Sequence, residues 1–99
     1  MEGKLNSLGS TLRQIREKKG LLLRQVAAAL EVDTAFVSKF ERGERGITKE
    51  QVTKLAKFLE TPEDKLLELW LADKVMNTLE GEQHQANALK LVTKRFKKK

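Results

Sequence analysis

The chain has 99 residues, with 20 Lys and Arg against 14 Asp and Glu, a net charge of +6 and a pI near 9.7. This length allows one domain, or one domain with an added arm, and leaves little room for the deep, water-excluding cleft of an enzyme. Cysteine is absent, which excludes disulfides, thiolate zinc sites and cysteine nucleophiles, and the basic balance favours an anionic partner such as nucleic acid, an acidic protein surface or anionic lipid.

Apolar residues repeat at helical spacing along nearly the whole chain, proline occurs once, and β-branched runs are absent. The pattern predicts an all-α protein. A first helix is expected over about 10–19, ended by Gly20, and a second over 23–30. A third helix should begin after Asp33, a good N-cap, and end at Gly43.

A fourth helix should start at Thr48, where Gln51 completes a capping box. Its inward stripe is Val52, Leu55, Ala56 and Leu59. The fifth helix is expected to have Thr61 as its cap and Pro62 at its first position, and to run to about Glu80 before Gly81. A short sixth helix over about 82–96 carries Leu89, Val92 and Phe96 on one side.

Only Glu31, Val32 and Asp33 join the second and third helices. So short a turn makes the two helices cross steeply, which is helix-turn-helix geometry. The apolar positions agree with this geometry, because the residues expected to face inward are Val26, Ala27, Leu30, Val32, Val37 and Phe40.

The third helix has two distinct sides at 100° per residue. Phe36, Val37 and Phe40 form the side that packs. The other side has two cations, three small side chains and no acid, namely Thr34, Ala35, Ser38, Lys39 and Arg42. Small side chains allow close approach and cations suit a phosphate-bearing surface, so this side is interpreted as a binding face, with a merely solvated face as the alternative.

The segment TLRQIREKKGLLLRQVAAALEVDTAFVSKFERGER, followed by LAKFL, resembles the phage repressor and Cro-like helix-turn-helix family, also called the xenobiotic-response-element type. The resemblance covers about 8–67 and is strongest in VSKFERG. It implies a five-helix DNA-binding domain over 8–67 with its helix-turn-helix core at 23–42, here with a lengthened fifth helix. It also implies sequence-specific binding of double-stranded DNA as a dimer.

The resemblance assigns roles to individual residues. It implies that the 34–42 helix enters the major groove, with base contacts from Thr34, Ala35 and Lys39. Contacts to the DNA backbone would come from Arg24, Gln25, Ser38, Arg42, Arg45 and Lys49. Arg16 and Glu41 are expected to form a partly buried structural ion pair.

Two positions depart from the family pattern. The second helix begins at Leu22 and Leu23, where the family has a polar cap, so its phosphate contact is open and the leucines could instead pack or meet a partner. Glu31 stands where the family often has glycine. Because a left-handed backbone costs a non-glycine residue about 1–2 kcal/mol, we expect the turn to be slightly remodelled.

The extension 68–99 is expected to mediate dimerisation. Its fifth helix is apolar on more than one face, so some of its apolar side chains need a cover other than the domain. Either the sixth helix folds back over them or two copies of the chain pair through them, and both can hold in part. The predicted dimer interface consists of Leu69, Trp70, Met76, Leu89, Val92 and Phe96. A homodimer predicts a pseudo-palindromic DNA site.

The segment 90–99 has six Lys and Arg and no acid, and is either an arm along DNA or a disordered solubilising tail. His84 stands alone, so no metal site is expected, nor are a cofactor, a small-molecule ligand or enzymatic activity. The first ten residues lack the apolar run of a signal peptide, and no stretch reaches the roughly 20 apolar residues of a membrane helix, so we expect a soluble, cytoplasmic protein. The main hypothesis is a DNA-binding transcriptional regulator; the alternative is a helix-turn-helix module that binds protein, as in antitoxins or regulatory subunits.

Overall fold

The computed structural model describes residues 7–98 and contains six helices and no strands within that range. They are α1 (Leu8–Lys18), α2 (Leu23–Leu30), α3 (Thr34–Glu41), α4 (Lys49–Leu59), α5 (Glu63–Leu79) and α6 (Gln85–Lys97). The predicted all-α fold, with a long fifth helix and a short sixth, is confirmed. The first six residues and Lys99 lie outside the described part. The prediction that the first ten residues are no signal peptide therefore falls mostly outside it, as does the end of the basic tail.

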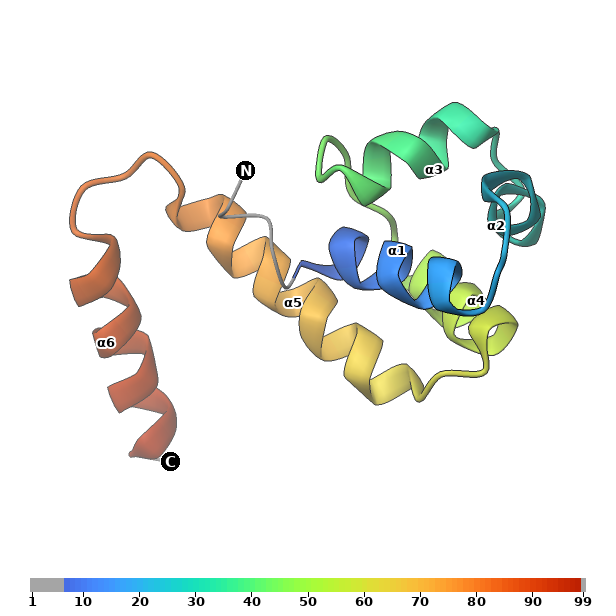
Figure 1. Cartoon of the computed structure of the whole chain (residues 1–99). Helices are drawn as coiled ribbons and strands as arrows, with labels where there is room; N and C mark the ends of the chain where they lie inside the picture. The colour runs from blue at the N-terminus through green and yellow to red at the C-terminus, as the bar shows by residue number, and fades with distance from the viewer. Residues whose placement is uncertain (1–6, 99) are drawn as a thin grey trace.

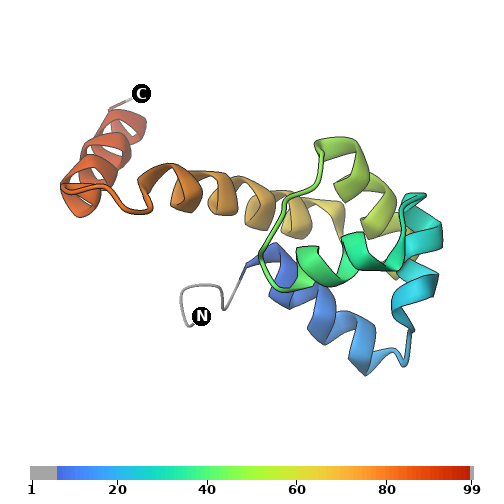
Figure 2. The same cartoon turned by 90° about the horizontal axis from the view of Figure 1, so that it is seen from above.

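Helices α1 to α4 and the first half of α5 form a bundle, whereas the second half of α5 and all of α6 project from it (Figure 1, Figure 2). Helix α1 packs on α3 and α5, α2 packs on α3 and α4, and α4 packs on α5. The Cα radius of gyration is 15.0 Å, against about 13 Å for a compact chain of 100 residues. The projecting arm accounts for the difference.

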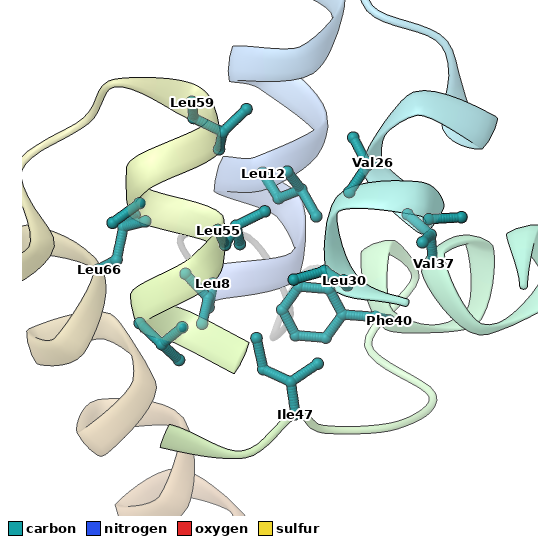
Figure 3. Packing of buried hydrophobic residues seen from close by; sticks show 13 residues of the cluster. Leu8, Leu12, Val26, Leu30, Val37, Phe40, Ile47, Leu55, Leu59 and Leu66 are labelled. Carbon is teal, nitrogen blue, oxygen red and sulfur yellow. The ribbon is translucent and has the colours of Figure 1, made fainter. Parts of the chain in front are cut away.

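The core lies between the five bundle helices and draws on residues far apart in the sequence (Figure 3). Leucine and valine side chains dominate it, together with Phe40 from α3. Its members are Leu8, Leu12, Val26, Ala27, Leu30, Val37, Phe40, Ile47, Val52, Leu55, Ala56, Leu59 and Leu66. The predicted stripe of α4 and the residues of α2 and α3 that were expected to face inward are thus buried in this core.

Three helix starts differ from the predictions. Helix α1 begins at Leu8 rather than near Ser10, and Ser7 caps it, since its hydroxyl accepts a hydrogen bond from the Ser10 backbone N–H at 3.1 Å. Pro62 takes the N-cap position of α5, and the Thr61 hydroxyl donates instead to the Leu59 carbonyl at 3.3 Å. Helix α6 begins at Gln85 rather than near Glu82, because residues 80–84 form a linker.

Gly9 marks the closest approach of two helices. A Cβ atom at this position would overlap the backbone carbonyl of Phe40, so α1 and α3 touch here backbone to backbone. This contact holds the last turn of α3 against the start of α1. The apolar pattern of the sequence does not predict this contact, because glycine has no side chain and so does not contribute to the pattern.

Helix α6 does not fold back onto α5. All of its residues except Ala88 are exposed, and both views show it standing clear of α5 (Figure 1, Figure 2). The basic segment is helical up to Lys97. No helix in residues 7–98 is long and apolar enough to cross a membrane, and no group of three His, Asp or Glu in that range could hold a metal ion.

Candidate nucleic-acid interface

The turn between α2 and α3 keeps the left-handed residue that the family pattern places there. Glu31 has φ 60° and ψ 44°, and its N–H donates to the Ala28 carbonyl at 3.1 Å. Val32 N–H donates to the Ala27 carbonyl at 2.9 Å, which completes the C-cap of α2. The expected remodelling of the turn was therefore wrong: the two cap hydrogen bonds and the packing of Val32 outweigh the strain at Glu31.

Asp33 then sets the start of α3. Its carboxylate accepts a hydrogen bond from the Phe36 N–H at 2.8 Å, in the N-cap geometry that the sequence predicts. Val37 and Phe40 point into the core and Phe36 is half-buried. Thr34, Ala35, Lys39 and Arg42 are consequently exposed on the outer side, with Ser38 half-buried among them.

An acid from the following loop lies beside this outer face. The Glu44 carboxylate accepts hydrogen bonds from Arg42 Nε at 3.0 Å and Arg42 Nη2 at 3.1 Å, while Arg42 Nη1 donates to the Ser38 hydroxyl. The pairing raises the pKa of Arg42 and lowers the pKa of Glu44, to which the nearby Lys39 also contributes. The helix itself holds no acid on this side, as predicted, but the loop supplies one.

Arg45 is held by an aromatic contact. Its guanidinium carbon lies 3.9 Å from the centroid of the Phe36 ring, a cation–π arrangement. The contact fixes the loop residue against the first turn of α3. Arg45 therefore presents its charge at the same edge of the molecule as the exposed start of α3.

The N-terminus of α2 lacks a side-chain cap from Leu22, and Gln25 instead satisfies the backbone N–H of Leu22 itself. The Gln25 side-chain oxygen accepts a hydrogen bond from Leu22 N–H at 2.7 Å, which leaves the amide NH₂ as a donor toward solvent. Leu21 and Leu23 pack against the core, and Leu22 is 48% exposed. Arg24 and Gln25 are both exposed beside the positive end of the α2 dipole.

Arg16 and Glu41 form a two-pronged ion pair between α1 and α3. Arg16 Nε lies 2.7 Å from one Glu41 oxygen and Nη2 lies 3.1 Å from the other, and the side chains are 13% and 5% exposed. Arg16 Nη1 also donates to the Leu21 carbonyl at 3.0 Å. The hydrogen bonds to Glu41 raise the pKa of Arg16. One side chain thus ties α1, the entry to α2 and the end of α3 together, which fixes the angle at which α3 leaves the bundle.

Lys49 is the first residue of α4 and is exposed. The Thr48 and Gln51 capping box that precedes it forms as predicted, with Gln51 N–H donating to the Thr48 hydroxyl at 3.1 Å and Thr48 N–H donating to the Gln51 side chain at 2.9 Å. The box gives the end of the loop after α3 a defined position, and with it the charge of Lys49.

The six residues predicted for a dimer interface divide into two groups. Leu69 and Trp70 pack against the core, and the Trp70 indole N–H donates to the Ile47 carbonyl at 2.8 Å. These two residues serve the domain itself and are removed from the predicted interface. The other four are exposed: Met76 57%, Leu89 45%, Val92 45% and Phe96 72%.

Three features of this region escaped prediction. Glu44 reaches Arg42 only because the loop turns back, although its spacing of two residues from Arg42 is a weak local signal. Gly9 and Asp73 act over long range: the Asp73 carboxylate accepts a hydrogen bond from Leu8 N–H at 3.1 Å, 65 residues away. No local pattern contains such a contact, and it extends the packing of α5 on the bundle beyond Leu67.

A steep α2–α3 crossing on a three-residue turn, with an exposed outer face on α3 and a buried pair behind it, defines a helix-turn-helix domain of the repressor type. The chain belongs to the helix-turn-helix DNA-binding family: the family model described as "Helix-turn-helix domain" matches residues 7–69. It is 36% identical over 64 residues to the HTH-type transcriptional repressor RghR of Bacillus subtilis (strain 168), an alignment that covers 64% of this chain and 47% of that protein. The chain thus matches about half the length of this curated relative. No solved structure matches it.

Proposed function

We propose that this protein is a sequence-specific, double-stranded DNA-binding transcriptional regulator that acts as a homodimer, with α3 in the major groove. The observation that carries the proposal is the outer side of α3, where Thr34, Ala35 and Lys39 are exposed and the helix holds no acid. A major groove admits one α-helix, and its base edges are read by side chains of this length and kind.

Lys39 is the long donor of the base-reading set. Its ammonium suits the O6 and N7 acceptors of guanine, while Thr34 and Ala35 suit thymine methyl groups. Such a set reads few bases directly, so sequence-dependent DNA shape supplies part of the specificity.

The phosphate contacts surround these three residues. Arg45 and Lys49 stand on the loop side, Arg24 and Gln25 stand at the N-terminus of α2, and the positive end of the α2 dipole adds to the second group. Arg42 and Ser38 complete the set, with Glu44 as a competitor for Arg42. Contacts of this kind position the protein and supply most of the affinity.

A single module of this type buries only about 600–1,000 Å² of protein surface on DNA, so tight binding requires two copies of the module. A twofold dimer places the two α3 helices about 34 Å apart, one turn of DNA, and selects a pseudo-palindromic site. The apolar residues exposed on the arm formed by α5 and α6 suit such pairing. The name of the relative RghR further favours repression over activation for this chain.

Selection of bound sequences from a random duplex pool tests this function most directly, because it reports binding, symmetry and half-site spacing together. Lys39→Ala should then weaken binding of the selected duplex by about 1–3 kcal/mol and leave random duplex nearly unchanged. Lys57→Ala, an exposed lysine on α4, is the matched control. Equal losses on both duplexes would make Lys39 a phosphate contact and remove it from the base-reading set.

Salt titration separates this function from a protein-binding helix-turn-helix module. Several phosphate contacts make log K fall steeply with log salt, by about 0.9 for each contact. A slope near zero on every duplex tested would leave protein recognition as the better explanation.

A further inference from the structure

Helix α5 has a second apolar side that the bundle does not use. Leu66 and Trp70 face the core, whereas Leu71 and Val75 lie about half a turn away and are 55% and 46% exposed. Leu79 continues their line one turn further along and is half-buried. We call Leu71, Val75 and Leu79 the α5 outer stripe.

Helix α6 has a single apolar side, formed by Leu89, Val92 and Phe96, which we call the α6 stripe. These residues recur at intervals of three and four, as in a helix that packs along another helix. They are 45%, 45% and 72% exposed, and no described residue covers them. An amphipathic helix gains little stability in water without a partner for this side.

The two helices carry opposite charge. Helix α6 contains Lys90, Lys94, Arg95 and Lys97 and no acid. Helix α5 has Glu68 one turn and Asp64 two turns before Leu71, on the side of the outer stripe, while its lysines, Lys65 and Lys74, lie off that side. The Lys74 ammonium sits 4.5 Å from the centroid of the Trp70 ring instead.

We propose that the α6 stripe of each copy packs antiparallel on the α5 outer stripe of a second copy, so that the two chains exchange their sixth helices. This inference rests on the homodimer of the proposed function and specifies how that dimer is held. The partner of α6 is therefore another molecule of this same chain.

The register follows from length and charge. Leu89 to Phe96 spans about 10.5 Å of helix and Leu71 to Leu79 about 12 Å, so the two stripes match in length. An antiparallel alignment sets Leu89 near Leu79 and Phe96 near Leu71. It also brings Lys97, at the basic end of α6, to the level of Glu68, with Asp64 one turn further along α5.

Charge also disfavours the other symmetric pairings. Two copies of α6 side by side would bring their lysines and arginines together, and two copies of α5 in a parallel pair would bring Asp64 and Glu68 together. Like charges in a contact suppress such pairings, and opposite charges favour the exchanged one.

The linker directs α6 toward a second molecule. Within residues 80–84, Gly81 and His84 both have left-handed backbones, with φ of 81° and 66°, and the chain leaves α5 at an angle that keeps α6 clear of α5 (Figure 1, Figure 2). A helix held away from its own chain but complementary to it is the arrangement from which exchanged dimers form.

The first test compares Val92→Asp with Leu91→Asp in the full chain by light scattering after size exclusion, at protein concentrations of tens of micromolar. Both changes place one acid on the same exposed helix, but Leu91, 53% exposed, lies away from the stripe. The exchange predicts that Val92→Asp is monomeric and Leu91→Asp remains dimeric. A dimeric Val92→Asp protein would overturn the exchange while leaving the proposed homodimer intact, and a monomeric wild type would overturn both.

The second test reverses charge on each helix. One chain carries Asp64→Lys and Glu68→Lys; the other carries Arg95→Glu and Lys97→Glu, at the two residues that flank the α6 stripe. Each alone should be at least tenfold weaker as a dimer than wild type, and an equimolar mixture should recover dimers that contain one of each. If the two variants stayed monomeric when mixed, α6 would be closing on its own chain. If the variant with Asp64→Lys and Glu68→Lys were dimeric by itself, the chains would be pairing without α5. Either result overturns the exchange. Circular dichroism confirms that both variants remain helical.

Discussion

Glu44 places a carboxylate beside the outer face of α3, where the proposed function requires cations to meet phosphate. Its carboxylate holds the Arg42 guanidinium through two hydrogen bonds and lies near Lys39. The hydrogen bonds from Arg42 lower the pKa of Glu44 below its ordinary value. Any duplex that approaches α3 must therefore either displace this carboxylate from Arg42 or tolerate its charge.

Glu44→Gln should raise the affinity for random duplex and make the salt dependence steeper. Freeing Arg42 for one further phosphate increases the slope of log K against log salt by about 0.9. Filter binding or fluorescence anisotropy across a salt series measures the slope. Glu82→Gln, in the linker before α6, removes the same charge far from α3 and should leave the slope unchanged; an equal effect of both variants would show that net charge, and not Arg42, is responsible.

Gly9 acts at the same scale through the side chain that it lacks. In an exposed helix, replacing glycine by alanine gains up to about 1 kcal/mol. Here the added Cβ would overlap the Phe40 carbonyl, and backbone atoms cannot move aside as a flexible side chain can.

Gly9→Ala should accordingly destabilise the fold by about 1–3 kcal/mol, as overpacking does elsewhere. Urea denaturation followed by circular dichroism measures the free energy of unfolding. Gly46→Ala is the control, because a Cβ there meets nothing within 4 Å. A Gly9→Ala protein as stable as the control would mean that α1 and α3 separate at little cost.

At the scale of the element, two helices end on a glutamate in a left-handed conformation. Glu31 closes α2 with φ 60° and Glu60 closes α4 with φ 55°. Both C-caps keep their backbone hydrogen bonds, from Val32 to Ala27 and from Thr61 to Ala56. The strain is therefore local to the two glutamates, and a residue without a Cβ relieves it.

Glu31→Gly and Glu60→Gly should each stabilise the protein by about 1 kcal/mol, seen as a higher urea midpoint. The gain at Glu31 should be slightly smaller, since this residue also pairs with Lys54 at 3.6 Å, an exposed contact worth at most about 0.5 kcal/mol. Glu31→Ala keeps the strain and loses the pair, so it should bring no gain. Lower midpoints for both glycine variants would contradict the account of the caps.

At the scale of the whole molecule, the bundle determines the stability of the single chain, and the projecting arm contributes little to that stability. The core is complete at Leu66, Trp70 and Asp73 hold α5 to the bundle, and α6 adds no buried residue. The free energy of unfolding of the single chain should thus depend on residues 7–80, whereas pairing should require α6 in addition to the α5 outer stripe.

A chain that ends at Glu80 should unfold within about 0.5 kcal/mol of the full chain at concentrations too low for dimers, because exposed segments contribute little. The same truncation should weaken binding to a palindromic duplex far more than binding to a half-site. Thermal melting and anisotropy provide the two measurements. A large loss of stability in the dilute truncated chain would show that α6 packs on its own bundle.

Much of this architecture could be predicted without coordinates, because its signals are local. The start of α3 at Asp33, the Thr48–Gln51 box and the inward stripes of the bundle helices follow from hydrogen bonds and periodicities that span at most a few turns. The pairing of Arg16 with Glu41 also follows, through the family resemblance. For the same reason the two sides of α3 were separable from spacing alone.

Tertiary structure decided the rest, since most of the remaining features join residues whose separation carries no sequence signal, and the pairing of Glu44 with Arg42 depends on the path of the loop. The bundle turned Leu69 and Trp70 inward, placed Gly9 under Phe40 and brought the Asp73 carboxylate to the start of α1. The loop returned Glu44 to Arg42, and the linker held α6 away from α5. The sequence by itself therefore determined which helices form and which face of α3 is open, because these depend on neighbours along the chain. Only the packed molecule decided which apolar and charged groups remain for a partner, because that depends on what the rest of the chain already covers.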